Sequence, residues 1–232
     1  MYKLIGIIIL IGIVKTQNSE SSEKNKCAAL APYCYCVSKL VITCDNFTDF
    51  AQLNFSKLEE TKIYELELEP LVPLSLDESL VLSDLEIYGQ VTLRKIKSFE
   101  LTANPFESAR RENLVRLNLF DLTLKFTLNG IELNNVCSMS AFDDVESELK
   151  PLFSSFDYVV FGDNIDYNKL VCPLVFLNAN IRILEMINLN STNRFTFKKL
   201  NKIKKDDNML NSNIGYLKIF NAKNIFLGIL TL

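Results

Sequence analysis

Cysteine is the residue type in this chain with the clearest chemistry. Four cysteines lie close together and two stand apart; in order they are Cys27, Cys34, Cys36, Cys44, Cys137 and Cys172. An even number of thiols in a secreted chain favours three disulfides, although spacing alone does not choose the pairs. A zinc knuckle is the alternative for the first four, but secretion and the absence of His argue against it.

The absence of histidine also argues against catalysis, because histidine is the commonest general base near neutral pH. Carboxylates or tyrosines would have to do any acid–base work. Glu65, Glu67 and Glu69 alternate along one predicted strand, and Glu86 lies in the next. Paired carboxylates could cleave glycosides, but polar side chains on the solvent face of a strand explain the same alternation. We therefore predict that the chain is not an enzyme.

Two further patterns could bind ions. Asp163, Asn164 and Asp166 offer oxygen ligands for calcium, but they lack the glycine and the distal glutamate of a calcium loop, so we predict a turn there. The basic run 194–205 could bind a sulfated glycan or an anionic surface. Two aspartates follow it at once, which favours a solvated connection. We predict neither a metal nor a cofactor.

Tyrosines at strand positions could be recognition residues, as aromatic side chains often are at interfaces. Packing in the core or at a sheet edge is the alternative. With the neighbouring glutamates they make a predicted binding face, composed of Tyr64, Glu65, Glu67, Glu86, Tyr88 and Tyr158.

The start of the chain predicts secretion. Lys3 precedes a short apolar run, residues 4–14, and polar sequence follows, which is the layout of a signal peptide. We predict a signal peptide over 1–16 and a disordered lead-in over 17–26; an uncleaved anchor is the alternative. Three sequons, at Asn46, Asn54 and Asn190, are then predicted glycan sites.

Short segments with alternating apolar residues recur along the chain. Their first apolar positions are Leu66, Leu85, Phe99, Leu117, Ile131, Val159, Leu184 and Leu217. Because no single segment can bury its apolar face alone, the segments must stack into a solenoid. Asn side chains near the strand ends can form hydrogen bonds with backbone groups of the turns. Residues 140–152 are predicted to form a helical return, and most other returns look irregular.

The first four cysteines have the spacing Cys27-x6-Cys34-x-Cys36-x7-Cys44, with Val41 and Ile42 before the last. This pattern resembles the N-terminal cap of extracellular leucine-rich-repeat proteins. The layout is similar to arthropod proteins labelled as the non-catalytic subunit of oplophorus-type luciferin monooxygenase, and residues 99–106 add to the likeness. The resemblance implies the pairs Cys27–Cys36 and Cys34–Cys44, and leaves Cys137 to pair with Cys172.

We thus predict an α/β solenoid: a degenerate leucine-rich-repeat array with a parallel concave sheet and mostly irregular convex returns. The cap occupies 27–46 and the array 47–232. An L-domain-like parallel β-helix is the competing fold, and it predicts sheets on more than one side.

The predicted function is non-enzymatic extracellular binding of a protein or a glycan on the concave face, without nucleic acid and without stable membrane insertion after signal cleavage. An accessory subunit of a secreted enzyme and a carboxylate-dependent hydrolase are the alternatives.

Overall fold

The computed structural model describes residues 30–38, 40–59, 61–111, 115–123, 125–132, 149–150, 152–165, 179–188, 190–196, 213–221 and 223–226. Several predictions fall outside these residues: the signal peptide, the lead-in, Cys27, Cys137, Cys172, Asp166, most of the helical return and most of the basic run.

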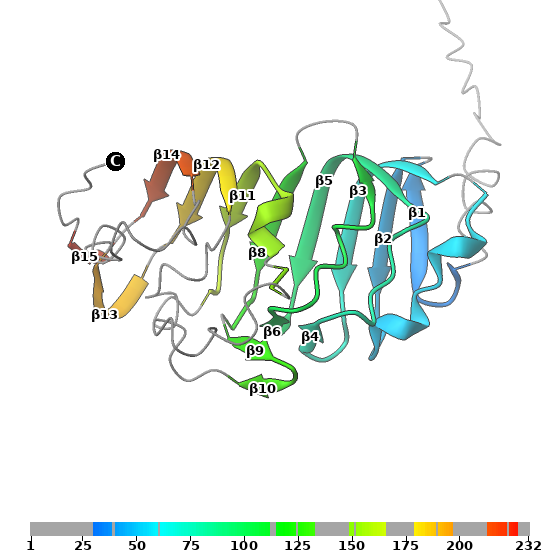
Figure 1. The fold of residues 1–232 in the computed structure, drawn as a ribbon, viewed down its shortest axis with the longest axis horizontal. Coiled ribbons are helices and arrows are strands. Elements are labelled where there is room, and N and C mark those ends of the chain that lie inside the picture. The colour runs from blue at the N-terminus through cyan, green and yellow to red at the C-terminus, as the bar shows by residue number, and fades with distance from the viewer. Residues whose placement is uncertain are drawn as a thin grey trace, which may run out of the picture.

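One large sheet, here called the main sheet, runs along the long axis of the molecule (Figure 1). Its strand order is β1-β2-β3-β5-β8-β11-β12-β14, and β7 pairs with β5 beside this path. All its pairs are parallel except β1–β2. The strands are β1 (Cys34–Ser38), β2 (Val41–Asp45), β3 (Lys62–Glu69), β5 (Glu86–Arg94), β7 (Arg110–Arg111), β8 (Arg116–Phe120), β11 (Tyr158–Phe161), β12 (Asn180–Ile187) and β14 (Asn213–Phe220).

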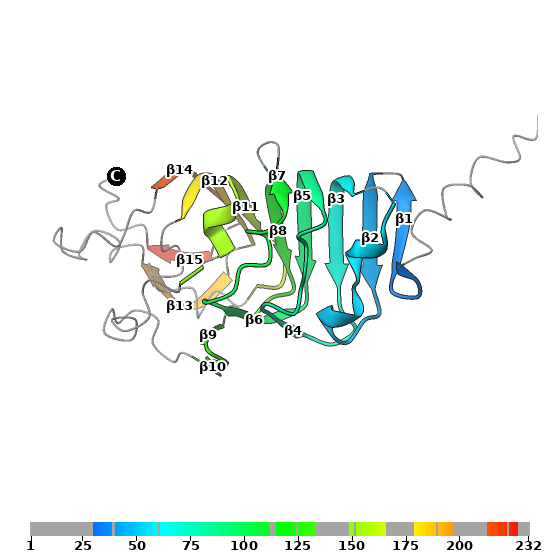
Figure 2. The same ribbon diagram turned by 45° about the vertical axis from the view of Figure 1, so that its right-hand side comes forward.

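A second sheet lies on another side of the coil, with the order β10-β9-β6-β4, and β13 pairs with β15 (Figures 1 and 2). These strands are β4 (Leu74–Leu76), β6 (Ile96–Glu100), β9 (Phe126–Leu128), β10 (Ile131–Glu132), β13 (Asn190–Thr196) and β15 (Lys223–Phe226). The chain is therefore a parallel β-solenoid of about four turns with little helix. The first return, between β2 and β3, contains two short 3-10 helices, whereas the next three each contribute a short strand to the second sheet, so the predicted irregular returns are present but are partly ordered. Sheets on more than one side are what the competing fold predicted.

The register of the main sheet corrects the predicted repeat. Residues that share one inward row are Ile42, Leu66, Val91, Leu117, Val159, Leu184 and Leu217. The first steps of this row are 24, 25 and 26 residues. The segments at 66, 117, 159, 184 and 217 were placed correctly. Those beginning at Phe99 and Ile131 belong to the second sheet, and Leu85 directly precedes β5, where Val91 is the residue in register.

Alternation explains why these segments stack. In β3, Ile63, Leu66 and Leu68 point inward and are at most 1% exposed. The glutamates between and after them point outward. Neighbouring coils repeat the pattern, so the inward rows form a continuous apolar core that no single coil could bury.

Asparagine and aspartate form the corners after the main-sheet strands. Asp121, Asn164, Asn188 and Asn221 all have positive φ, which these residue types tolerate better than most. Their side chains bond from coil to coil: Asn164 donates to Asp121 at 2.7 Å, Asn188 donates to Asp163, and Asn221 donates to Asn188 at 3.0 Å. The turn predicted at 163–164 is therefore present, as one layer of this ladder.

A chain of aromatic rings crosses the core from the second sheet to the main sheet. Phe126 on β9 contacts Phe99 on β6, with ring centroids 5.8 Å apart. Phe99 contacts Phe153 at 6.3 Å, and Phe153 contacts Phe161 on β11 at 5.7 Å. Phe153 lies on a 3-10 helix, η6 (Leu152–Ser155), at the end of the predicted helical return. These rings tie the two sheets together.

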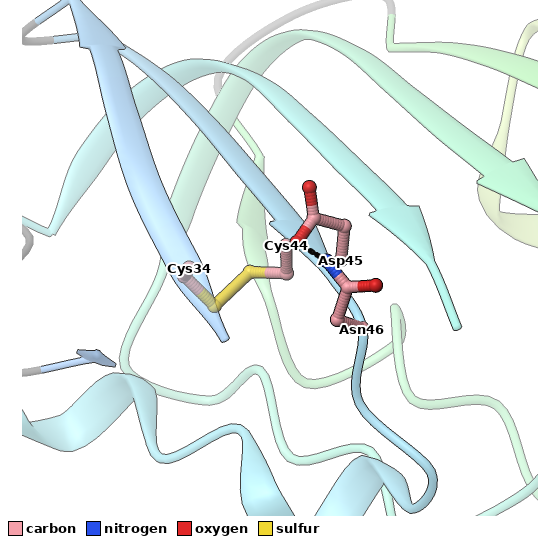
Figure 3. Close-up of a disulfide and its surroundings, with 4 residues drawn as sticks. All are labelled: Cys34, Cys44, Asp45 and Asn46. Carbon is pink, nitrogen blue, oxygen red and sulfur yellow. Dashed lines mark hydrogen bonds between the residues drawn. A yellow bond between two sulfur atoms is a disulfide. The ribbon is translucent and has the colours of Figure 1, made fainter. Parts of the chain in front are cut away.

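The cap at the N-terminal end is a β-hairpin. β1 pairs antiparallel with β2, and a disulfide joins the partners Cys34 and Cys44 (Figure 3). This pair agrees with the expected cap. Cys36 is also disulfide-bonded, and its expected partner lies outside the described residues. After the hairpin come two 3-10 helices, η2 (Phe50–Gln52) and η3 (Phe55–Lys57). Each begins with a phenylalanine whose side chain is buried.

The β9–β10 hairpin is held by one carboxylate of the second sheet. Glu100 accepts hydrogen bonds from the backbone N–H groups of Asn129 and Gly130, both at 2.9 Å, and from the Thr102 hydroxyl at 2.9 Å. Partial burial alone would raise the pKa of Glu100, but these hydrogen bonds outweigh it, so the pKa is lowered.

Replacing Glu100 with Gln should lower the free energy of unfolding by about 1 kcal/mol at pH 7. Because the folded-state pKa is depressed, the ionised group stabilises the fold above its unfolded pKa of about 4.3, and this contribution is lost as the pH falls through the folded value. Urea denaturation of both proteins should therefore show a difference in the free energy of unfolding at pH 7 that disappears as the pH falls below the folded-state pKa of Glu100. Glu107→Gln, which removes an exposed ion pair with Lys150, is the control and should change little. A difference independent of pH would contradict this role.

Candidate binding face

The solvent-facing side of the main sheet, here called the outer face, presents three rows of side chains that run across the strands. They come from alternate positions, and the first two rows stay in register from β2 to β14. The third row lies at or just beyond the strand ends and includes one glycine, Gly162. The first row is Val41, Glu65, Gln90, Arg116, Tyr158, Ile183 and Tyr216. The second is Thr43, Glu67, Thr92, Asn118, Val160, Glu185 and Lys218. The third is Asp45, Glu69, Arg94, Phe120, Gly162, Ile187 and Phe220.

The acidic residues lie mainly on β2 and β3, and a cation on β5 neutralises part of them. Arg94 Nε lies 2.9 Å from a Glu67 oxygen and 3.8 Å from Glu69, while Lys95 Nζ lies 2.8 Å from Glu69. The Arg94 guanidinium also stacks on the Phe120 ring at 4.6 Å. These contacts couple three successive coils and hold the side chains of the third row in place.

Phe120 keeps its place because the next residue in its row is glycine. A Cβ built on Gly162 would meet the Phe120 ring at 2.1 Å, so any larger residue would displace the ring and its stacked guanidinium.

An irregularity between β3 and β5 gathers a second set of predicted residues. Tyr64 contacts Tyr88 edge-on, with ring centroids 5.5 Å apart. Lys62 pairs with Glu86 at 3.2 Å and lies 5.4 Å from the Tyr88 ring. Room for Tyr64 comes from Gly89, where a Cβ would lie 2.4 Å from the Tyr64 carbonyl oxygen.

The centre of the face is a small buried polar network. Asn118 is 7% exposed, and its amide nitrogen donates to Gln90 and to Thr92, both at 3.3 Å. Its amide oxygen accepts from Arg116 Nε at 2.7 Å. Thr92 and Val160 beside it are also buried, although they point outward. Gln90 and Arg116 of the first row are therefore hydrogen-bonded to this network, which holds their side chains in place.

Tyr158 is the centre of the C-terminal half of the face. Its hydroxyl donates to Glu185 at 2.5 Å, and Arg116 and Lys218 lie 4.5 and 5.9 Å from its ring centroid. The hydrogen bond to Glu185, followed by partial burial, raises the pKa of Tyr158, while Arg116 and Arg182 act in the opposite direction. Several charges therefore converge on one ring.

Three exposed aromatic residues on this face were not singled out from the sequence. Tyr35 on β1 is 48% exposed, and partial burial followed by the charges of Asp45 and Glu67 raises its pKa. Tyr216 and Phe220 on β14 are 67% and 49% exposed. Their signal was the outward half of the alternation within their own strands, and the register between strands then decides which residues are their neighbours.

The six predicted face residues do share one side of the main sheet. Glu65, Glu67 and Tyr158 lie in the regular rows, and Tyr64, Glu86 and Tyr88 cluster at the irregularity.

Of the predicted sequons, Asn46 and Asn54 are exposed, while the residue between Asn and Thr or Ser is buried in each. Asn46 donates to Asp45 at 2.6 Å at the end of β2 (Figure 3). Asn190 begins β13.

No group of His, Cys, Asp and Glu within the described ranges has the arrangement of a metal site. No helix among those residues is long and apolar enough to cross a bilayer. Comparison of the chain with protein-family models, with curated proteins and with solved structures found no match.

Proposed function

We propose that this chain is a secreted binding protein that recognises a protein ligand through the outer face of its main sheet, without catalysing a reaction. One observation carries the proposal: seven neighbouring strands, β2 to β14, present in-register rows of aromatic and charged side chains on one side of the main sheet, and Tyr35 on β1 extends that side. Tyrosine and arginine, both present there, are the residues enriched in interface hot spots.

The size of this face suits a protein ligand. Eight strands lie at a spacing of about 4.8 Å, and the three rows together are about 16 Å wide. The flat area of the face is therefore roughly 550 Å², without the added surface of protruding side chains. Each partner in a standard interface contributes about 800 Å². Because the side chains are fixed by contacts between coils, little conformational entropy would be lost on binding.

The distribution of charge favours a protein over a uniformly charged glycan. Asp45, Glu65, Glu67 and Glu69 lie at the β2–β3 end, whereas Arg116 and Lys218 lie toward β14. A polyanionic glycan laid along the face would meet carboxylates at one end. A protein surface can present both signs.

We also propose that the protein is secreted, and we propose a structural class for its repeats. The leader pattern, the cysteine cluster and the exposed sequons support an extracellular location. The first three steps of the inward row, 24 to 26 residues, are compatible with leucine-rich repeats, whereas the later steps from Leu117 to Val159 and from Leu184 to Leu217 are longer than that period. The second sheet instead favours an L-domain-like parallel β-helix, which we propose as the closer architectural description.

A binding screen tests the proposed function. The full chain is assayed by biolayer interferometry against a panel of extracellular ectodomains. We expect the double variant Tyr35→Ser, Tyr216→Ser to weaken binding of a true ligand at least tenfold. The matched control is Val81→Ser with Ile131→Ser, which alters exposed apolar residues outside the main sheet. A ligand that responds to the control and not to the face variant would contradict the proposal.

A further inference from the structure

Cationic side chains on the two halves of the outer face differ in whether they form ion pairs. Arg94, Lys95 and Lys62 each lie within 4 Å of a carboxylate oxygen. In contrast, no ion pair joins Arg116, Arg182 or Lys218 to a carboxylate in the part of the chain that the structure describes. The C-terminal half of the face therefore carries three cations that form no ion pair among the described residues, with one carboxylate, Glu185, between them.

Arg116 is held in a defined orientation. Its Nε donates to Asn118, which is buried and is itself fixed by Gln90 and Thr92. Its guanidinium carbon lies 4.5 Å from the Tyr158 ring centroid. With Nε bonded and the plane stacked, the two terminal amino groups keep their donors for a ligand. A guanidinium positioned in this way suits an oxyanion that accepts two parallel hydrogen bonds.

The other charged groups extend this positive region across the strands. Lys218, 5.9 Å from the same ring, is exposed on β14, and Arg182 is exposed on β12. Glu185 is the acidic residue among them, and its carboxylate accepts a 2.5 Å hydrogen bond from the Tyr158 hydroxyl. From β8 to β14 the cations span three strand spacings, or about 14 Å. An extended ligand with several anionic groups fits this spacing better than a single ion.

We propose that this half of the outer face binds an acidic segment of the protein ligand, with a carboxylate paired to Arg116 and further carboxylates near Arg182 and Lys218. The inference rests on the proposed function and names the chemistry of its partner. A peptide carboxylate matches the planar guanidinium. A short acidic segment also avoids the β2–β3 end, where Asp45 and the three glutamates of β3 would repel a longer polyanion.

The test uses the full chain and a short synthetic peptide of alternating Glu and Ser, measured by isothermal titration calorimetry. We expect binding that weakens as the salt concentration rises. Arg116→Gln should lower the affinity at least tenfold, and Arg116→Lys should recover only part of it, because lysine lacks the planar fork. Lys218→Gln, an exposed substitution, should lower the affinity severalfold and guards against misfolding of the Arg116 variants. Lys97→Gln, exposed on β6, removes the same charge from the second sheet and should have no effect.

Three results would overturn the inference: no binding of the peptide, equal losses for Arg116→Gln and Lys97→Gln, or tighter binding of a sulfated oligosaccharide through the same three cations. If a protein ligand found in the ectodomain screen still depends on Tyr35 and Tyr216 while the acidic peptide fails, only this inference fails. If substitutions on the outer face do not change the affinity for that ligand, the proposed function fails as well.

Discussion

Replacing Phe153 with Ala should lower the free energy of unfolding by about 3–5 kcal/mol, the usual cost of removing a buried aromatic ring. Phe153 is 1% exposed and stands between Phe99 on the second sheet and Phe161 on the main sheet. Its loss leaves a cavity between the sheets that regular strands cannot collapse to fill. Urea denaturation monitored by far-UV circular dichroism measures the change.

Two comparisons make this prediction specific. Phe220→Ala removes the same ring from an outward position that is 49% exposed, and it should cost less than about 1 kcal/mol. A double-mutant cycle between Phe99 and Phe153 should give a coupling energy of about 0.5–1.5 kcal/mol beyond burial. A Phe153→Ala protein as stable as the Phe220→Ala protein would show that the ring chain does not join the sheets.

Removing the disulfide of the cap should be the second large effect. Cys34 and Cys44 are 10 residues apart in the sequence. Loop-closure entropy for that separation gives about 3 kcal/mol of stabilisation. The double variant Cys34→Ala, Cys44→Ala should therefore unfold at a clearly lower urea concentration. Cys44 is also fully buried at the end of the core, so its truncation adds a packing loss.

The position of the destabilised strands tests the role of the disulfide more specifically than the total loss of stability does. Because β1 is the first strand of the main sheet, loss of the disulfide should first raise hydrogen exchange in β1 and β2, and leave β11 and β12 unchanged. Val37→Ala, an exposed change on β1, is the matched control. Uniformly faster exchange along the whole sheet would contradict a local cap.

Local sequence was sufficient for the features that depend on neighbouring residues in the chain. Alternation of apolar residues predicted strands at 66–68, 117–119 and 159–161, since side-chain direction in a strand reverses at every residue. The cysteine spacing predicted an N-terminal cap with a Cys34–Cys44 disulfide through its resemblance to known caps. Asn164 and Asn188 were predicted near strand ends as partners for turn backbone, and both lie at corners with positive φ, which asparagine tolerates.

Tertiary contacts decided the remainder, and the best example is the segment that contains Phe99. Its alternation matches that of a main-sheet strand, because strands of both sheets point apolar residues at the same core. The corner that separates β5 from β6 is at Lys95, with φ of 53°, and lysine gives no turn signal in the sequence. Only stacking on the coils before and after places that corner.

The outer face shows the same division. The sequence by itself determined which side chains point outward from each strand, and so it identified Glu65, Glu67 and Tyr158. The register between strands decided which of them become neighbours. Tyr158 meets Arg116 from 42 residues earlier in the chain and Glu185 from 27 residues later. Alternation repeats at every second residue and carries no information about such separations, whereas stacking of coils into one core does.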